Sequence, residues 1–142
     1  MAYLTDGHPT TLTFGENTNV LFRVKELTPP GIDGGGSIDT TTMNNATWRT
    51  FMPKALKTLT EASLTVQYDP AIYDDILTML QVNQEITVTF PDDSTLAFWG
   101  WVDKFSPERL VEGEMPTASI TIVPSNMDGD NSNAEIAPDY NT

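Results

Sequence analysis

The sequence contains no cysteine. Disulfide bonds, thiolate nucleophiles and cysteine-based metal sites are therefore excluded. Histidine occurs once, as His8, between a glycine and a proline near the N-terminus. A Ser-His-Asp triad would depend on this single residue, and a histidine-rich metal site is excluded. We expect His8 to be a surface residue, because short turn-like termini rarely pack into a core.

Basic residues are scarce, since 7 lysines and arginines stand against 20 aspartates and glutamates, for a net charge of -13. This acidity argues against nucleic-acid binding through phosphate neutralisation, which needs a basic surface. Long apolar runs are also missing, and none approaches the roughly 20 residues that cross a bilayer. The first residues show no signal-peptide pattern. We expect a protein made in a cytoplasm that does not itself insert into a membrane.

The 142 residues suffice for one domain with a single core. Segments of alternating apolar residues, separated by turn residues, predict strands at 10–14, 19–27, 61–68, 85–90, 95–105 and 117–123. Many short strands with turns between them are typical of antiparallel β structure. The predicted fold class is mainly β, an antiparallel β-sandwich or partly closed barrel.

One segment changes from strand to helix periodicity. Asp69 suits a helix N-cap, and Pro70 suits the first helical position. Apolar residues then follow at helical spacing, at Ile72, Ile76, Met79 and Leu80. We predict one amphipathic helix over about 70–82, flanking the sheet.

The most unusual segment is a long arm over about 28–60, which contains a glycine triplet and many threonines. The stretches 37–42 and 47–52 predict a β-hairpin-like arm with Asn44 and Asn45 at its tip. No acidic residue occurs between Asp39 and Glu61. An arm that carries the opposite charge to its body suits contact with another copy of the same chain.

The predicted domain organisation is a β-sandwich domain over 1–124, with the assembly arm 28–60, followed by a flexible acidic C-terminal tail over 125–142. The tail resembles the opening of a calcium loop at Asp128. It lacks the glycine expected at the sixth position and the glutamate expected at the twelfth. We therefore expect no metal and no cofactor.

Adjacent carboxylates are the simplest basis for an enzyme, and they occur at Asp74-Asp75 and Asp92-Asp93. A glycosidase needs two carboxyl groups facing each other across a cleft, which neighbouring residues do not provide. A small hydrolase is thus the least supported interpretation, and we expect no enzyme activity.

Trp99 and Trp101 lie on one face of the predicted strand 95–105, opposite Phe98 and Val102. Three interpretations remain open. The predicted helix covers one side of this strand, the two tryptophans form a subunit interface, or they form a platform that stacks on sugar rings. The last would make the chain a carbohydrate-binding β-sandwich module.

The order of these parts resembles the major tail tube proteins of long-tailed, non-contractile bacteriophages, and related tubes of contractile tails and injection machines remain open as alternatives. The passages that carry the resemblance are GGGSIDTTTMNNATWRTFMPKAL, EASLTVQYDPAIYDDILTML and ITVTFPDDSTLAFWGWVDKFSPERLVEGEMPTASITIVPSN. The resemblance implies a β-sandwich with one helix, whose hexameric rings stack into a hollow tube of the virion. It also implies assembly in the host cytoplasm, contact with other tail proteins at the tube ends, and passage of DNA without specific binding.

Two groups of residues acquire expected roles. The arm is expected to contact neighbouring copies through Ile38, Met43, Trp48, Arg49, Phe51, Lys54 and Lys57. Like charge in a narrow bore prevents DNA from sticking. Some of the following acids are therefore expected to line it: Asp69, Glu85, Asp92, Asp93, Asp103 and Glu114.

Overall fold

A computed structural model describes residues 10–15 and 24–141 of the chain. His8 and the first part of the strand predicted over 19–27 lie outside the described residues. Within the described ranges, no helix has the length and apolar character needed to span a bilayer.

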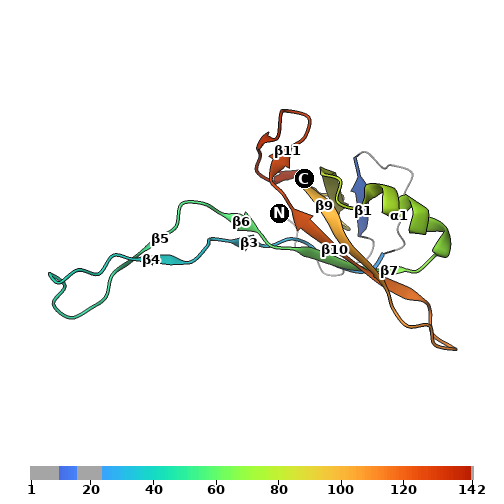
Figure 1. Ribbon diagram of the computed structural model, residues 1–142, viewed down its shortest axis with the longest axis horizontal. Helices are drawn as coiled ribbons and strands as arrows, with labels where there is room; N and C mark the ends of the chain where they lie inside the picture. Colours follow the sequence, from blue (N-terminus) through green and yellow to red (C-terminus); the bar gives the residue numbers. More distant parts are fainter. Residues whose placement is uncertain (1–9, 16–23, 142) are drawn as a thin grey trace.

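The body is built on one seven-stranded antiparallel sheet (Figure 1). Its strands, in spatial order, are β1 (Thr11–Phe14), β8 (Gln84–Thr89), β9 (Thr95–Pro107), β10 (Thr117–Pro124), β7 (Ala62–Gln67) and β2 (Val24–Thr28), and β13 (Asp139–Asn141) also pairs with β9. The prediction of a mainly β, antiparallel fold with one helix is confirmed. Among the described strands the sheet does not close into a barrel, because β1 and β2 remain at its two ends.

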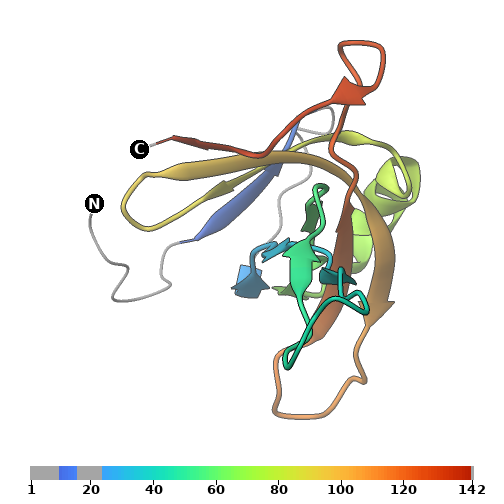
Figure 2. The same ribbon diagram turned by 90° about the vertical axis from the view of Figure 1, so that its left-hand side faces the viewer.

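The long strand β9 joins the two halves of the sheet. It has 13 residues, pairs with β8 over its first part and with β10 over its second. Thr121 lies opposite Lys104 and Ile122 lies opposite Val102, so Asp103 is the extra residue of a bulge. A bulge bends and twists its strand. Figure 2 shows β9 curving from one half of the sheet to the other, so that the sheet wraps around its own core.

The core lies on the concave side of this sheet. Burial alternates along β7 and β10, as expected for strands with one face inward. Leu64 pairs with Ile120, and Val66 pairs with Ala118, so buried residues meet across the strand pair. Burying an aliphatic side chain of this size contributes about 1.5–3 kcal/mol before entropy is counted.

The helix begins as predicted. The Asp69 carboxylate accepts a hydrogen bond from the Ala71 N–H at 3.0 Å, followed by the 3-10 turn η1 (Pro70–Ile72) and the helix α1 (Tyr73–Met79). Ile76 and Met79 face the core, and the Ile72 side chain lies outside the described structure.

The helix ends earlier than the predicted 82. Gln81 has a φ of 61°. Its N–H donates to the Val102 carbonyl at 3.0 Å, and Leu80 forms a parallel bridge with Val102. The chain leaves the helix because β9 offers these backbone partners, a tertiary contact that helical periodicity does not reveal.

The C-terminal segment, for which the composition predicts a flexible tail, contains three short strands. β11 (Met127–Asp128) and β12 (Ala134–Glu135) form a hairpin, and β13 pairs with the start of β9. The Ser125 N–H donates to the Trp99 carbonyl at 2.8 Å. Backbone pairing of this kind satisfies polar groups without apolar side chains, so a polar composition did not indicate it.

The arm projects far from the body as a narrow ribbon (Figure 1). β3 (Ile32–Asp33) pairs with β6 (Thr58–Leu59) near the body, and β4 (Ser37–Asp39) pairs with β5 (Phe51–Pro53) farther out. The predicted hairpin-like arm is confirmed, with shorter strands than the sequence suggested.

Gly100 allows β9 and β10 to approach closely. A Cβ at this position would lie 2.6 Å from the Val123 carbonyl oxygen, whereas a Cβ at Gly34 would meet nothing within 4 Å. We expect Gly100→Ala to lower the free energy of unfolding by about 1–3 kcal/mol, because the backbone must shift. Gly34→Ala is the control and should have little effect. Equal urea midpoints for the two variants would contradict this account of the sheet.

Candidate functional site

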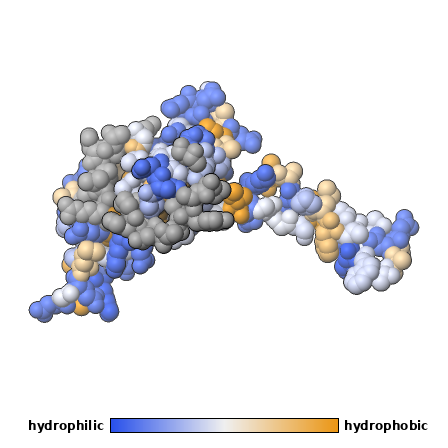
Figure 3. Space-filling model, turned by 180° about the vertical axis from the view of Figure 1, so that it is seen from behind, coloured by the Kyte–Doolittle hydropathy of each residue, from blue (hydrophilic) through white to orange (hydrophobic). Residues whose placement is uncertain are grey.

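The arm exposes an unusual amount of apolar surface. Met43 is 103% exposed, Trp48 81% and Leu56 80%, while Ile38 and Phe51 are exposed to lesser degrees. Figure 3 shows apolar residues recurring along the arm, away from the body. Single exposed apolar residues are common on soluble proteins, but a series of them along one projection marks an interaction surface. The predicted apolar anchors therefore all lie where another molecule can reach them.

Hydrogen bonds within the arm hold its shape. The Thr40 N–H donates to the Thr50 carbonyl at 2.9 Å, and the Thr60 N–H donates to the Gly31 carbonyl at the same distance, 2.9 Å. The Gly31 N–H donates in turn to Thr60 Oγ1 at 2.8 Å. The arm is thus a defined two-stranded ribbon, even though it buries almost no side chains of its own.

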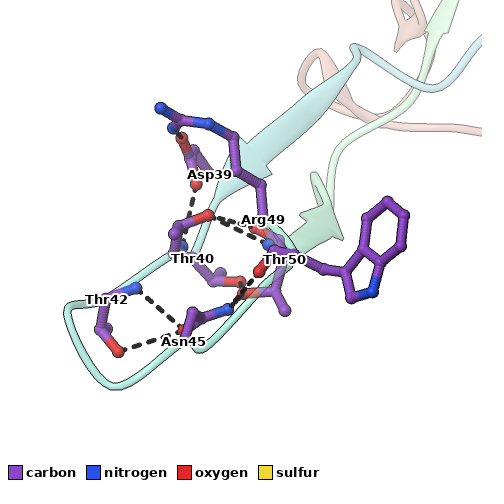
Figure 4. A network of polar contacts seen from close by, with 8 residues as sticks. Asp39, Thr40, Thr42, Asn45, Arg49 and Thr50 are labelled. Atoms are coloured by element: carbon purple, nitrogen blue, oxygen red, sulfur yellow. Dashed lines mark hydrogen bonds and ion pairs between the residues drawn. The ribbon is translucent and has the colours of Figure 1, made fainter.

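Threonine and asparagine side chains organise the tip of the arm (Figure 4). Asn45 Nδ2 donates to the Trp48 carbonyl at 2.8 Å, and Asn45 Oδ1 accepts from the Thr42 N–H at 3.2 Å. The Thr50 N–H donates to Thr41 Oγ1 at 3.0 Å. These side chains replace backbone partners in the turn. The sequence placed the tip correctly at Asn44 and Asn45, but this bonding pattern was not predicted.

The basic residues of the arm differ in their pairing. Arg49 Nη1 lies 3.3 Å from Asp39 Oδ2 across the hairpin, and both side chains are well exposed. An exposed ion pair contributes roughly 0–1 kcal/mol. Arg49 was expected to meet acidic surface on a neighbour, yet it already has a partner in its own arm. Lys54 and Lys57 are exposed, and neither forms an ion pair with any described residue.

The two tryptophans do not form an exposed platform. Trp99 is only 6% exposed, and a Cβ at Gly129 would lie 3.0 Å from its ring. The covering element is the C-terminal segment, whereas the helix packs on the opposite face, with Phe98 and Val102 in the core. Stacking on sugar requires an open aromatic face. The carbohydrate-binding alternative is therefore rejected, because Trp99 offers no open aromatic face.

A polar network fixes this covering segment. Asn83 Nδ2 donates to the Met127 carbonyl at 3.0 Å, and Ser125 Oγ donates to Asn83 Oδ1 at 2.6 Å. Asn83 follows the helix, so the network ties the C-terminal segment to the connection between α1 and β8. No feature of the sequence singled out Asn83 or Ser125.

The acids proposed for the bore lie on separate elements. Asp69 caps the helix, Glu85 is exposed on β8, and Asp103 is half-buried at the bulge of β9. Asp92 and Asp93 occupy the turn between β8 and β9, and Glu114 lies in the loop before β10. No three acidic residues in the described ranges come together as a metal site.

Hydrogen bonds account for the acidic pair in the turn. The Ser94 side chain and backbone donate to Asp92 and hold its pKa below the ordinary value. Asp93 has a φ of 66°, which a turn aspartate tolerates. Asp128 plays a comparable local role, because its carboxylate accepts from the Asp130 N–H at 3.0 Å. Asp92 and Asp128 thus each accept hydrogen bonds from residues of their own turn.

No family model and no curated protein matches the sequence. Solved structures do match. A chain from the virion of a native gene transfer agent particle has a TM-score of 0.67 at 9% identity, and the match covers 98% of this chain and 100% of that one. A chain from the baseplate of the anti-feeding prophage, a 6-fold symmetrised cryo-EM structure, has a TM-score of 0.59 at 10% identity, covering 90% and 96%. The chain shares its fold with these particle components.

The shared fold includes nearly the whole of each matched chain, so the arm and the C-terminal segment are not additions to a smaller common domain. The TM-scores of 0.67 and 0.59 establish a common fold, and at 9% and 10% identity no individual residue role carries over.

Protonation of Asp39 should loosen the arm. Hydrogen bonds from the Thr41 side chain and backbone, with a smaller contribution from Arg49, lower the pKa of Asp39 below 3.8. A lowered folded pKa means that these contacts are fully present above pH 3.8 and are lost as the pH falls through the folded value. We expect amide exchange at Thr41, corrected for intrinsic pH dependence, to accelerate in that window.

Asp39→Asn is the matched control, because asparagine still accepts from the Thr41 N–H but does not titrate. It should remove the pH dependence at Thr41 and leave the turn at Asp92 unaffected. The same acid response in Asp39→Asn would assign the effect to another group.

Proposed function

We propose that this protein is the structural subunit of a phage-type tail tube, of the kind found in long-tailed, non-contractile tails. Six copies form a ring, and rings stack into a hollow tube that conducts DNA. The tube belongs to the virion, assembles in the host cytoplasm and contacts other tail proteins at its ends. The observation that carries the proposal is the long arm, whose apolar anchors are exposed in the part of the chain that the structure describes.

The fold likeness supports this proposal. The two matched chains belong to a virion particle and to a baseplate, which are assemblies of many subunits. The baseplate structure is 6-fold symmetrised, which agrees with a ring of six copies. A structural role also fits the acidic groups. Hydrogen bonds from Thr41 and Ser94, within the same turns, account for the lowered pKa values of Asp39 and Asp92.

The sheet supplies a basis for ring closure. β2 ends the strand order on one side among the described residues. An edge strand can pair with another chain, and natural proteins protect or use such edges. A heterologous contact between this edge and a different surface of the next copy closes into a ring when its rotation divides a full turn. The ring contact would then involve the sheet, leaving the arm to reach beyond the ring.

The assembly proposal is tested by electron microscopy of the concentrated, purified protein. We expect rings or tubes from the unmodified chain. Trp48→Ala combined with Phe51→Ala should remain folded, because both side chains are exposed. It should raise the concentration required for tube formation by about thirtyfold or more, since buried aromatic anchors dominate interfaces.

Met127→Ala is a suitable control, because Met127 is an exposed apolar residue on the C-terminal hairpin and not on the arm. Its tubes should resemble those of the unmodified chain. If the arm variant assembled at the original concentration, the arm would not be the assembly element. If the unmodified chain formed no multimer at any concentration, the tube function would be excluded.

An acidic bore would let DNA pass without binding. Asp92 and Asp93 are both exposed in a short turn at one end of β8 and β9, and Glu85 lies at the other end of β8. We expect tubes of Asp92→Lys with Asp93→Lys to retain short duplex DNA at low salt, while unmodified tubes release it. Asp130→Lys with Glu135→Lys makes the same charge change at exposed positions of the C-terminal hairpin. Equal retention by both variants would contradict a bore position for the turn.

A further inference from the structure

An apolar groove lies between the helix and the bent part of β9. It has a volume of about 380 Å³, and Tyr73, Leu77 and Leu80 line one side while Asp103 and Phe105 line the other. The Tyr73 ring meets Phe105 edge-on, with centroids 6.2 Å apart. Tyr73 and Leu77 are 47% and 56% exposed. This volume is that of a pocket for a small organic group. A large aromatic side chain is a group of that size.

The loop between β9 and β10 extends this surface. β9 runs from the groove directly into residues 108–116, where Leu110 is 70% exposed and Met115 48%. Glu112 and Glu114 are exposed beside them. The groove and this loop together form a surface with exposed apolar side chains, which we name the acceptor surface. It has excess negative charge, since its four acids outnumber its two basic residues, Lys104 and Arg109; the acids are Asp103, Glu108, Glu112 and Glu114.

The acceptor surface and the arm lie at opposite ends of the molecule. Figure 1 shows the arm at one end of the longest axis, with α1 and the β9–β10 loop toward the other. A subunit's own arm therefore does not fill its own groove. An occupant supplied by this chain must come from a second copy.

The arm and the acceptor surface are complementary in two respects. The arm presents exposed aromatic side chains, Trp48 and Phe51, and the acceptor surface presents an apolar groove. The arm also has two lysines, Lys54 and Lys57, without ion-pair partners in the described structure, and the acceptor loop has exposed glutamates. Apolar anchors surrounded by complementary charge are the usual composition of a specific interface.

We infer that the arm of one copy docks on the acceptor surface of the next, with Trp48 or Phe51 in the α1–β9 groove and Lys54 and Lys57 beside the β9–β10 loop. This inference rests on the proposed tube function and names the surface that receives the arm. Because the two surfaces differ and lie at opposite ends, the contact is heterologous and repeats in one direction. It also places Asp103 and Glu114 at the contact between copies, rather than in the bore.

A mixing experiment tests the direction of this contact. The arm variant, Trp48→Ala with Phe51→Ala, keeps its acceptor surface. The acceptor variant, Leu77→Lys with Leu110→Lys, keeps its arm, and both substituted positions are exposed. Circular dichroism verifies that each variant is folded. Each alone should stop at the smallest unit, a subunit or a single ring, and elongation should require an about thirtyfold higher concentration.

Mixed in equal amounts, the two variants should form paired units that do not elongate, because each pair contains one intact contact and no further one. Sedimentation velocity distinguishes the single unit, the pair and the tube. Met127→Lys, an apolar-to-lysine change outside both surfaces, should elongate normally.

The possible results separate this inference from the tube function. An acceptor variant that elongates normally would overturn the assigned surface while leaving the tube function in place. A mixture that remains as single units would do the same. Unmodified protein that forms no multimer would overturn both.

A charge exchange tests the polar part of the contact. Lys54→Glu with Lys57→Glu should block elongation at low salt, since like charges would then face the loop. Adding Glu112→Lys with Glu114→Lys to the same chain should restore it. Adding Asp130→Lys with Glu135→Lys instead makes the same change in net charge at exposed positions away from the loop. Equal restoration by the two pairs would exclude a specific lysine–loop contact.

Discussion

A two-stranded ribbon has no interior, and this constraint governs the arm. The arm satisfies its backbone through β3–β6 and β4–β5 pairing, and its tip through Asn45 and Thr50. None of these bonds buries Trp48 or Met43, which remain almost fully exposed. Exposed aromatic area of this kind is stabilised only when another surface covers it. The arm is thus structurally defined in the single subunit and energetically incomplete without a partner.

The body has the opposite character, because its sheet curves until it encloses a core. The bulge at Asp103 and the close approach at Gly100 both occur in β9, the strand that joins the two halves. The helix covers one face of that strand, and the C-terminal hairpin covers Trp99 on the other. The bend also opens the groove between α1 and β9. One curved strand therefore shapes both the core and the surface that we assign to the neighbouring arm.

Charge divides the molecule in the same way. The chain as a whole has a charge of -13, while Arg49, Lys54 and Lys57 follow one another in the arm with no intervening acid. Arg49 is partly neutralised by Asp39, so the two lysines carry the available positive charge. Surface charges of this kind influence the rate and register of association more than its affinity. The apolar anchors would supply most of the binding energy, and the lysines would direct the arm toward acidic surface.

The sequence alone determined the features that depend on local pattern. Alternation predicted the strands, Asp69 and Pro70 predicted the helix start, and threonine-rich stretches with Asn44 and Asn45 predicted the hairpin arm. The tertiary structure alone decided the early end of the helix at Met79, the covering of Trp99, the strand pairing of the C-terminal segment and the ion pair of Arg49 with Asp39. The first three depend on atoms far apart in the chain, such as the Val102 carbonyl beside Gln81. The ion pair depends on the register of the β4–β5 hairpin. Local periodicity does not predict such contacts, because they form only once the strands have paired.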